Sequence, residues 1–505
     1  MFFFFCFLTF QNIFLSESND ALVAKLQKWG FSKLNVEIMS TQFLIDSDQS
    51  KKRRITYDEN NGEDIISYLP EFITSRILSL LPTKDALRTC VLSKDWEHKW
   101  TGIYNIDIDD DMRFVLKKTR KTSFINFVDR IFFFSRNSTL KRFSLQCRLE
   151  YKAHRMISWI SAALMRNVED LEIVYNDEVV VSPGRLFNCT SLTTMKLKWP
   201  CIFRVSSQNL FSSLKSLYLD RTKFQGECVP STSKSVFDFP VLETLELENC
   251  KWLKVNLVEI NAPALSMFKV VCYSYLPEVD KCQIKFSKAK LGKCEFAGRF
   301  VEDFDFSATS VFSATIDIRS IRKIGSQAGL LLQGFCGLNH LKMSGDVVEA
   351  VVESNQGPLL PKFNMLKRLE VLTKCNSGAL LELLHAMPFL ESIVLQMWCW
   401  EDYDYDEVES LPSCIVSHLK EIRFSSFCKS LPEYRMVEFL WTNALRLKKI
   451  VGLRGESSEE RQRKKMFGQV GEESEEKEIE NFWAKLKTVF EQKEHGIFVK
   501  KKMLT

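Results

Sequence analysis

The strongest constraint on the fold is a short apolar pattern that recurs through the middle of the chain. The pattern is L-x-x-L-x-L, with any apolar residue allowed at the leucine positions, as in Leu242-Glu-Thr-Leu245-Glu-Leu247. Alternating apolar side chains predict a short strand with one buried face in each copy, and no copy can bury that face without its neighbours. The copies start at Leu140, Val168, Leu192, Leu214, Leu242, Leu265, Leu291, Val311, Leu338, Leu366, Leu390 and Leu419.

The spacing of these copies indicates how they stack. Successive starts lie 20 to 29 residues apart, which is the range of leucine-rich repeats. The ninth position of such a repeat takes Asn or Cys, which serves the turn after the strand. Asn176 and Cys250 occupy that position, and six cysteines lie within one residue of it: Cys147, Cys201, Cys272, Cys375, Cys399 and Cys428. We therefore expect an α/β repeat solenoid, a leucine-rich-repeat horseshoe or arc, with buried turn thiols rather than redox sensors.

The cysteines also bear on the compartment. The chain of 505 residues has 15 cysteines, and no two lie closer than Cys272 and Cys282. This spacing excludes C-x-x-C metal and redox motifs and argues against a secreted disulfide framework, so we expect a cytoplasmic and/or nuclear protein. The apolar start MFFFFCFLTFQNIFL lacks a positive n-region, and Gln11 and Asn12 interrupt it, which is atypical of a signal peptide. The run Lys51–Arg54 could be a nuclear-import signal or a solvated basic arm.

A compact helical segment precedes the repeats. Leu69, Ile73, Ile77 and Leu81 recur every fourth residue and predict a helix from near Pro70 to Pro82. Thr83 is expected to cap a second helix, and Ser93 a third that carries Trp96 and Trp100. So small a module cannot bury all its apolar groups alone, so it should have a partner.

Two stretches resemble a known family. The run DIISYLPEFITSRILSLLPTKDALRTCVLSKDW, from Asp64 to Trp96 and followed by Trp100, resembles the F-box of the plant F-box/leucine-rich-repeat/FBD group. The run LPSCIVSHLKEIRF (residues 411–424), with Glu433 and the run LWTNALRLKK (residues 440–449), is similar to the FBD domain that closes such proteins. The resemblance implies a small three-helix F-box (64–104), leucine-rich repeats (105–395) and an FBD domain continuing the stack (396–450). The residue pattern outside it predicts a mostly flexible extension (1–63) and a charged linker with a terminal helix (451–505).

The same resemblance implies a function. F-box proteins of this group are substrate-recognition subunits of Skp–cullin–F-box ubiquitin ligases. The F-box would dock on a Skp-type adaptor, and through it on a cullin, while the repeats and FBD domain hold a target protein whose contact residues the sequence does not reveal. By motif position, ten residues would form or brace the adaptor surface: Leu69, Pro70, Ile77, Leu78, Leu81, Pro82, Val91, Leu92, Ser93 and Trp96.

The sequence offers little for catalysis. It lacks the glycine-rich phosphate loops, H-E-x-x-H and G-x-S-x-G, and its six histidines have no partners at metal-ligand spacing. The acidic run Asp402–Asp406 starts like a calcium loop but lacks the turn glycine. We expect a solvated insertion, with an acidic, aromatic loop that contacts a basic partner as the alternative. Charges such as Lys367 and Arg368 fall on outward strand positions and indicate an ordinary solvated face. We expect no enzyme activity, metal or cofactor, and a net charge of only +5 does not indicate nucleic-acid or membrane binding.

Three alternatives remain beside the ligase receptor. The first is a repeat-based interaction scaffold in which the F-box-like segment only caps the solenoid. The second is an extracellular repeat receptor, which rests on the Phe-rich start alone. A hydrolase or transferase is the third and lacks a candidate site.

Overall fold

A computed structural model describes most of the chain from Leu69 onward, in two compact units, Met1–Glu172 and Ile173–Thr505. Each unit is described by itself below. The described residues are 69–111, 117–135, 139–176, 186, 189–204, 208–225, 234–273, 282–287, 289–298, 303–305, 311–318, 324–335, 337–353, 360–396, 403–405, 408–425, 431–452, 477, 480–481, 484–486, 488, 490–494 and 497–500. The predicted N-terminal extension and the Lys51–Arg54 run lie outside them.

The first unit begins with short helices and continues into a parallel strand pair. Strand β1 (Asn105–Asp109) pairs with β2 (Arg142–Cys147) so that Ile106 faces Phe143 across the ladder. The helices α6 (Lys117–Phe134) and α7 (Ala153–Leu164) follow β1 and β2, respectively. The helical segment before β1 consists of α4 (Glu71–Leu78), α5 (Thr83–Arg88) and three 3₁₀ turns, η1 (Thr89–Val91), η2 (Lys94–Trp96) and η3 (Lys99–Gly102).

The structure corrects three local predictions in this segment. Helix α4 begins after Pro70 as predicted, but it ends at Leu78 rather than at Pro82. The predicted Thr83 cap is wrong, because the amides of Asp85 and Ala86 donate to the carbonyl of Pro82 instead. The predicted third α-helix is wrong as well, because the chain after Ser93 forms the 3₁₀ turns η2 and η3, and the Ser93 side chain makes no capping bond. The described segment therefore has two α-helices rather than three.

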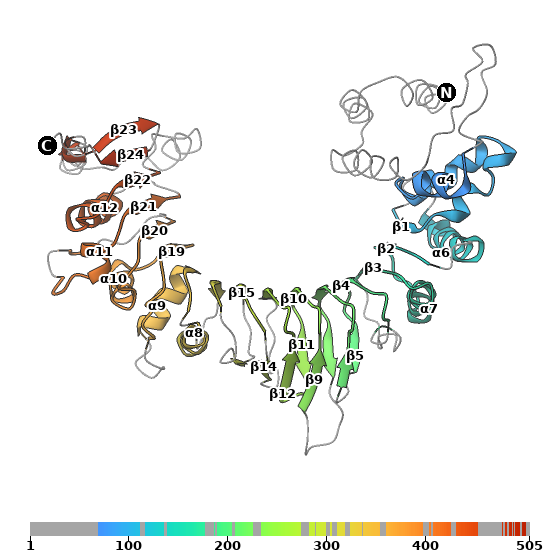
Figure 1. The fold of residues 1–505 in the computed structure, drawn as a ribbon, viewed down its shortest axis with the longest axis horizontal. Coiled ribbons are helices and arrows are strands. Elements are labelled where there is room, and N and C mark those ends of the chain that lie inside the picture. Colours follow the sequence, from blue (N-terminus) through green and yellow to red (C-terminus); the bar gives the residue numbers. More distant parts are fainter. Residues whose placement is uncertain are drawn as a thin grey trace, which may run out of the picture. The chain divides into compact units, whose positions relative to one another are not determined.

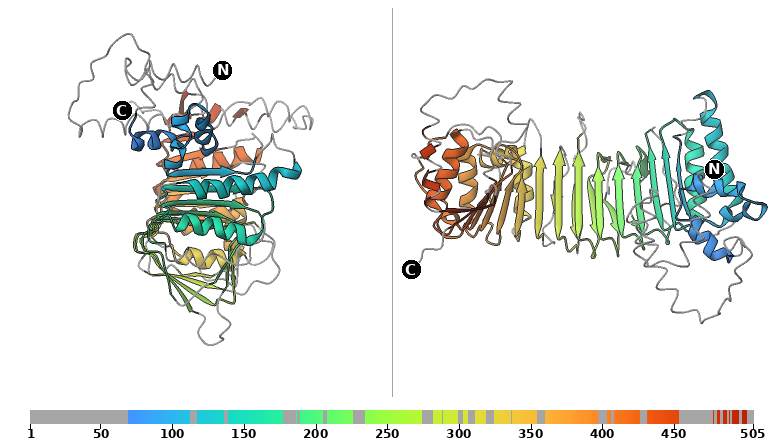
Figure 2. Two further views of the ribbon diagram at one scale, coloured as in Figure 1. Left: turned by 90° about the vertical axis from the view of Figure 1, so that its right-hand side faces the viewer. Right: turned by 90° about the horizontal axis from the view of Figure 1, so that it is seen from above.

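The second unit is built on a mostly parallel sheet. Its strands lie side by side in the order of the sequence (Figure 2), and each pairs in parallel with the next as far as β22. Their side chains alternate between buried and half-buried, as in β10, which the apolar pattern dictates. The strands are β4 (Thr194–Lys198), β7 (Ser216–Asp220), β10 (Thr244–Glu248), β13 (Met267–Cys272), β15 (Lys293–Gly298), β17 (Ser313–Ile318), β18 (His340–Met343), β19 (Arg368–Val371), β20 (Ser392–Leu395), β21 (Glu421–Phe424) and β22 (Lys449–Val451).

The predicted repeat register is confirmed in all twelve copies. In each of the twelve copies, including those of β2 and β3 (Asp170–Tyr175), the strand begins two residues after the predicted start. The first apolar residue of every copy is buried, with at most 3% of its surface exposed, at Val311. The sequence analysis missed two further copies, one starting at Ile103 before β1 and one at Leu447 before β22, and both residues are 1% exposed.

The segments that connect one strand of the main sheet to the next contain strands in the first part of the second unit and helices in the later part. The earlier ones form two small parallel sheets, β5 (Ile202–Arg204), β8 (Lys223–Gln225) and β11 (Lys251–Leu253), and β6 (Gln208–Leu210), β9 (Lys234–Asp238), β12 (Leu257–Asn261), β14 (Gln283–Ser287) and β16 (Asp303–Asp305). The later ones form the helices α8 (Ile324–Gln333), α9 (Gly345–Glu353), α10 (Ser377–His385), α11 (Ser413–Ser417) and α12 (Leu431–Asn443), which lie along one face of the sheet from β17 to β22 (Figure 1).

Phenylalanine fills the core between the main sheet and these return segments. The rings of Phe268 and Phe286 lie 4.7 Å apart, and Phe268 also contacts Phe296 at 5.9 Å. Phe335 extends the cluster toward α8, 6.1 Å from Phe296. These rings are fully buried, so most of the aromatic content of this part of the chain serves packing.

The end of the chain extends the sheet. Strand β24 (Ile497–Lys500) pairs with β22 in the antiparallel direction, and β23 (Phe490–Glu494) pairs with β24. The sequence analysis expected a terminal helix that includes Phe490. Residues 484–486 are helical, but Phe490 begins β23, so the predicted helix ends before it.

Candidate docking surface of the first unit

The inner face of the helical segment is polar and is bonded to β1. The Ser79 hydroxyl accepts a hydrogen bond from the amide of Tyr104 at 3.0 Å. The Thr83 hydroxyl accepts one from the amide of Asp107 at 2.7 Å. Both hydroxyl side chains are buried, so they satisfy amides on the edge of β1 that does not pair with β2.

Close packing and an ion pair complete this inner contact. A Cβ atom on Gly102 would lie 2.3 Å from the Ser75 hydroxyl oxygen, so α4 and η3 approach closely because residue 102 has no side chain. The Lys84 ammonium lies 2.7 Å from a carboxylate oxygen of Asp109 at the end of β1. The inner face therefore holds the segment in place.

The same segment also carries apolar side chains in solvent, and we call the solvent-exposed surface around them the outer face. Phe72 on α4 is 71% exposed, Val91 on η1 is 83% exposed, and Leu92 is 39% exposed. Leu69 and Ile77 are half-buried, so the predicted stripe is not sealed inside the chain. Single exposed apolar residues are common on protein surfaces, but several on one small module are typical of a contact with another molecule.

The ten residues predicted for the adaptor surface differ in exposure. Pro70, Pro82, Val91, Leu92 and Ser93 are exposed; Leu69, Ile77 and Leu81 are half-buried; Leu78 and Trp96 are buried. Leu78 and Trp96 are buried, so they could support the exposed residues by packing inside the segment. The sequence analysis did not include Phe72 among these residues, because it lies outside the stripe of every fourth residue. Its position as an aromatic residue in the first turn of the predicted helix could have indicated it.

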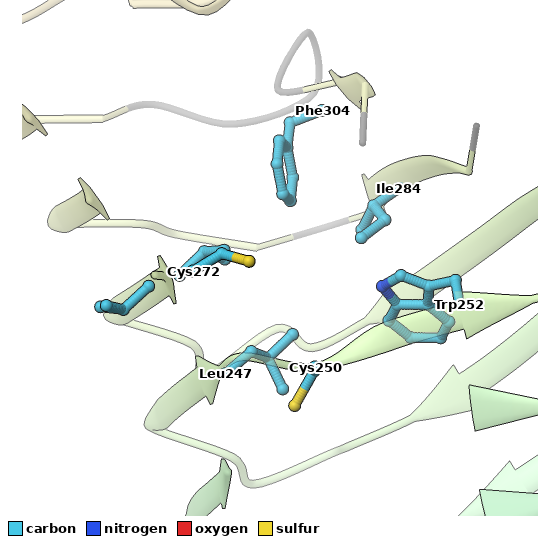
Figure 3. A pocket seen from close by; sticks show the side chains of 8 residues that line it. Leu247, Cys250, Trp252, Cys272, Ile284 and Phe304 are labelled. Atoms are coloured by element: carbon cyan, nitrogen blue, oxygen red, sulfur yellow. The ribbon is translucent and has the colours of Figure 1, made fainter. Parts of the chain in front are cut away.

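Ligand sites are scarce in the parts of the second unit that the structure describes. The best-defined pocket is lined by Leu247, Cys250, Trp252, Val270, Val271, Cys272, Ile284 and Phe304 (Figure 3). Its cavity volume of about 10 Å³ leaves room for about one water molecule. We find no cluster of metal-ligating side chains among the residues with described positions.

The buried thiols are not poised for chemistry. Burial raises the pKa of Cys201 to about 12, although hydrogen bonds from Thr222 and the backbone of Cys201 oppose the rise. Burial also raises the pKa of Cys147 and Cys375, and nearby carboxylates add to the effect. A thiol with a raised pKa stays protonated and is a poor nucleophile. The turn cysteines Cys250 and Cys272 are half-buried rather than buried, and Cys399 and Cys428 lie outside the described residues.

The acidic, aromatic run at 402–406 was expected to be a solvated insertion, and its described part corrects that view. The Tyr405 ring stacks on Phe439 of α12 at 4.7 Å. The Tyr405 hydroxyl donates to the Ser377 hydroxyl of α10 at 2.9 Å. Tyr403 packs over Gly378, where a Cβ atom would lie 2.9 Å from the ring. This run therefore links two helices, and only Asp404 among its described residues is exposed.

Comparisons with known proteins bear on both ends of the described chain. The FBD family model matches residues 406–451, which contain β21, α12 and β22. An F-box/LRR-repeat protein of Arabidopsis thaliana is 27% identical over 67% of this chain and 93% of its own length. An F-box/FBD/LRR-repeat protein of the same plant is 25% identical over 79% of this chain and 91% of its own length. The chain is similar to these plant F-box/FBD/LRR-repeat proteins.

A third relative is more similar over a shorter stretch. Another F-box/FBD/LRR-repeat protein of Arabidopsis thaliana is 32% identical over 49% of this chain and 56% of its own length. The names of these relatives combine the three parts expected of this chain, an F-box, leucine-rich repeats and an FBD domain. None of its described helices is long and apolar enough to cross a membrane.

Proposed function

We propose that this chain is a non-catalytic substrate-recognition subunit of a Skp–cullin–F-box ubiquitin ligase, acting in the cytoplasm or nucleus. Its F-box would dock on a Skp-type adaptor, and through it on a cullin, while its repeats and FBD domain hold a target protein. The observation that carries the proposal is the division of the F-box into two faces. Ser79 and Thr83 hold the inner face on β1, and Phe72, Val91 and Leu92 leave the outer face open.

The energetics favour a protein partner for the outer face. Burying a large apolar side chain contributes about 1.5–3 kcal/mol relative to leaving it in water. Phe72 and Val91 are therefore costly to expose on a segment that already has its internal contacts. An apolar helix or groove of an adaptor would recover this energy, and a few such residues can dominate an interface.

The proposed role needs no reactive group in this chain. A receptor raises the effective concentration of its target beside a thioester carried by another protein. The raised pKa of Cys201 and the small cavity at Trp252 agree with such a role.

The scaffold alternative also has an observation in its favour. The Thr83–Asp107 and Ser79–Tyr104 hydrogen bonds make the F-box a cap for the edge of β1, and a cap alone would not require an adaptor. A cap alone, however, would not explain why the apolar side chains of Phe72, Val91 and Leu92 are exposed to solvent. Recruitment of a cullin separates the two functions.

Co-purification tests the proposal. The full chain would be co-expressed with a Skp-type adaptor and a cullin, and both partners would be quantified after capture of the chain. We expect Leu69→Ala/Pro70→Ala to reduce the recovery of both partners strongly. A matched control is Met165→Ala, which truncates a residue that is 64% exposed outside the F-box. A folded wild-type chain that recovers the adaptor but no cullin, or neither partner, would instead support the scaffold.

A further inference from the structure

One face of the sheet at the C-terminal end of the repeats carries an excess of positive charge. On β18–β21 the buried and half-buried residues alternate, and α8–α12 lie on the buried side. The half-exposed side chains therefore point to the opposite face. Together with the residues just before the strands they form a basic patch of seven cations and three carboxylates: Lys342, Lys367, Arg368, Lys420, Arg423, Lys448 and Lys449, and Glu370, Glu391 and Glu421.

Each carboxylate of the basic patch is already held by two cations. Glu370 lies 2.5 Å from Lys342 and 2.8 Å from Arg368, with the His340 imidazole at 3.3 Å. Glu391 bridges Lys367 at 3.0 Å and Lys420 at 2.5 Å. Glu421 lies 3.1 Å from Arg423 and 3.8 Å from Lys449. These pairs arrange the cations but cannot neutralise them, since the cations outnumber the carboxylates. On the neighbouring β17, Asp317 lies on the same face and adds a further negative charge at the border of the patch.

The centre of the basic patch is shaped by short side chains. Strand β20 presents Ser392 and Val394 on this face, between Arg368 of β19 and Arg423 of β21. The side chains of these arginines are 36% and 43% exposed. The Arg423 guanidinium donates one hydrogen bond to Glu421 from an Nη atom, and its Nε is buried. The remaining Nη hydrogens are therefore the donors that a partner could reach. Arginine binds carboxylates through parallel hydrogen bonds, which makes both residues suited to an acidic chain lying over β20.

The composition of the basic patch favours a peptide over a nucleic acid. Proteins that bind single strands combine positive charge with aromatic side chains on which bases stack. The strand positions that face outward on β18–β22 carry His340 but no Phe, Tyr or Trp. Their charge therefore fits carboxylates or phosphates on a protein segment better than it fits stacked bases.

We propose that the basic patch binds an acidic segment of a partner protein, with Arg368 and Arg423 as its main contacts. That this partner is the target presented for ubiquitination rests on the proposed function. The patch overlaps the FBD domain, because β21 and β22 lie within residues 406–451. The sequence analysis assigned Lys367 and Arg368 to an ordinary solvated face. The proposal adds that these charges select the partner.

Fluorescence anisotropy with a labelled poly-glutamate peptide tests this proposal on the full chain at low salt. We expect Arg368→Gln/Arg423→Gln to raise the Kd roughly tenfold, as loss of charge-assisted hydrogen bonds would do. The matched control is Lys196→Gln/Lys198→Gln, which removes the same charge from β4 on the same sheet face. We expect that control to stay within about twofold of the wild type, and thermal unfolding would verify the fold of each variant.

Three outcomes would overturn the proposal. They are no measurable binding of the peptide, equal losses in the β4 control, and tighter binding of a single-stranded oligonucleotide that the arginine variant also weakens. If Arg368→Gln/Arg423→Gln does not fold, Lys367→Gln/Lys420→Gln provides the second variant, with the same expectation. Adaptor binding, measured in parallel, separates the two claims: peptide binding without adaptor binding would leave the basic patch standing and reject the ligase role.

Discussion

The amide of Asp107 donates a 2.7 Å hydrogen bond to the hydroxyl of Thr83, which ties the second F-box helix to the first strand of the sheet. The bond is buried on the Thr83 side, and it occupies an amide that would otherwise lie on an unpaired strand edge. The F-box therefore has one face committed to its own chain and another available to a partner. The arrangement separates stability from docking, which makes the two experimentally distinct.

The first prediction concerns this bond. Thr83→Val keeps the volume of the side chain but leaves the Asp107 amide without an acceptor, so we expect a loss of about 1–3 kcal/mol in the free energy of unfolding. Urea unfolding measures it. Thr89→Val is the control, because the Thr89 hydroxyl only donates to the carbonyl of Ala86 three residues earlier. Equal unfolding free energies for both variants would contradict the structural role of Thr83.

A second prediction concerns a glycine at the end of β15. Gly298 has φ +86°, and a Cβ atom there would lie 2.0 Å from the carbonyl oxygen of Cys272 on the adjacent strand. We expect Gly298→Ala to destabilise the second unit by about 1–3 kcal/mol. Gly292→Ala, where the nearest contact is an ordinary 3.4 Å, should have little effect. Melting temperatures of the two variants provide the comparison, and a harmless Gly298→Ala would argue against this strand register.

Thiol alkylation gives a third prediction. Burial raises the pKa of Cys201, Cys294 and Cys414 to about 12. Iodoacetamide reacts with the thiolate, so these three cysteines should resist modification in the native chain at about pH 8. Peptide mass spectrometry would report the labelled fraction, with the urea-unfolded chain as control. Similar labelling rates in the native and unfolded chains would show that the repeat core is open.

The fourth prediction is a pH dependence at Glu370. Partial burial raises the pKa of Glu370, but hydrogen bonds from Lys342 and Arg368 lower it more, so the net pKa lies below its ordinary value of 4.5. A carboxylate with a lowered pKa in the folded state stabilises the fold above its unfolded pKa, and this contribution is lost as the pH falls through the folded pKa. The difference in melting temperature between wild type and Glu370→Gln should therefore be largest near neutral pH and shrink toward about pH 3. A difference that grows on acidification would contradict the assigned ion pairs.

The repeats could be predicted because their signal is local and periodic. Apolar residues at alternate positions must face one core, so the register at Leu291 and Val311 is correct even though these copies are weak. The copies at Ile103 and Leu447 were missed because each start lies inside a segment assigned to another domain, the F-box (64–104) or the FBD domain (396–450). The apolar pattern is complete at Ile103, whereas Gly452 takes the third apolar position of the copy at Leu447.

Long-range contacts explain what the sequence could not provide. Thr83 follows a proline at a helix start, which favours a local cap, yet its hydroxyl binds a strand amide 24 residues away. Tyr405 lies in an acidic run, yet its ring stacks on Phe439. The exposure of Phe72 depends on how α4 packs against the rest of its segment, and the stripe alone does not fix that packing. The charge excess of the basic patch likewise becomes visible only when the strands are aligned.

The affinity of the full chain for a purified Skp-type adaptor, measured by isothermal titration calorimetry, tests the central claim most directly. The account predicts tight binding by the wild type and a loss of at least roughly 100-fold for Val91→Asp/Leu92→Asp, because charges would replace apolar contacts. As a control, Phe133→Asp places a charge outside the F-box on a residue that is about as exposed as Val91. The affinity of this variant should stay within about threefold of the wild type. Unchanged affinity in the Val91/Leu92 variant, or no binding by the folded wild type, would contradict the claim that the outer face of the F-box is the docking surface.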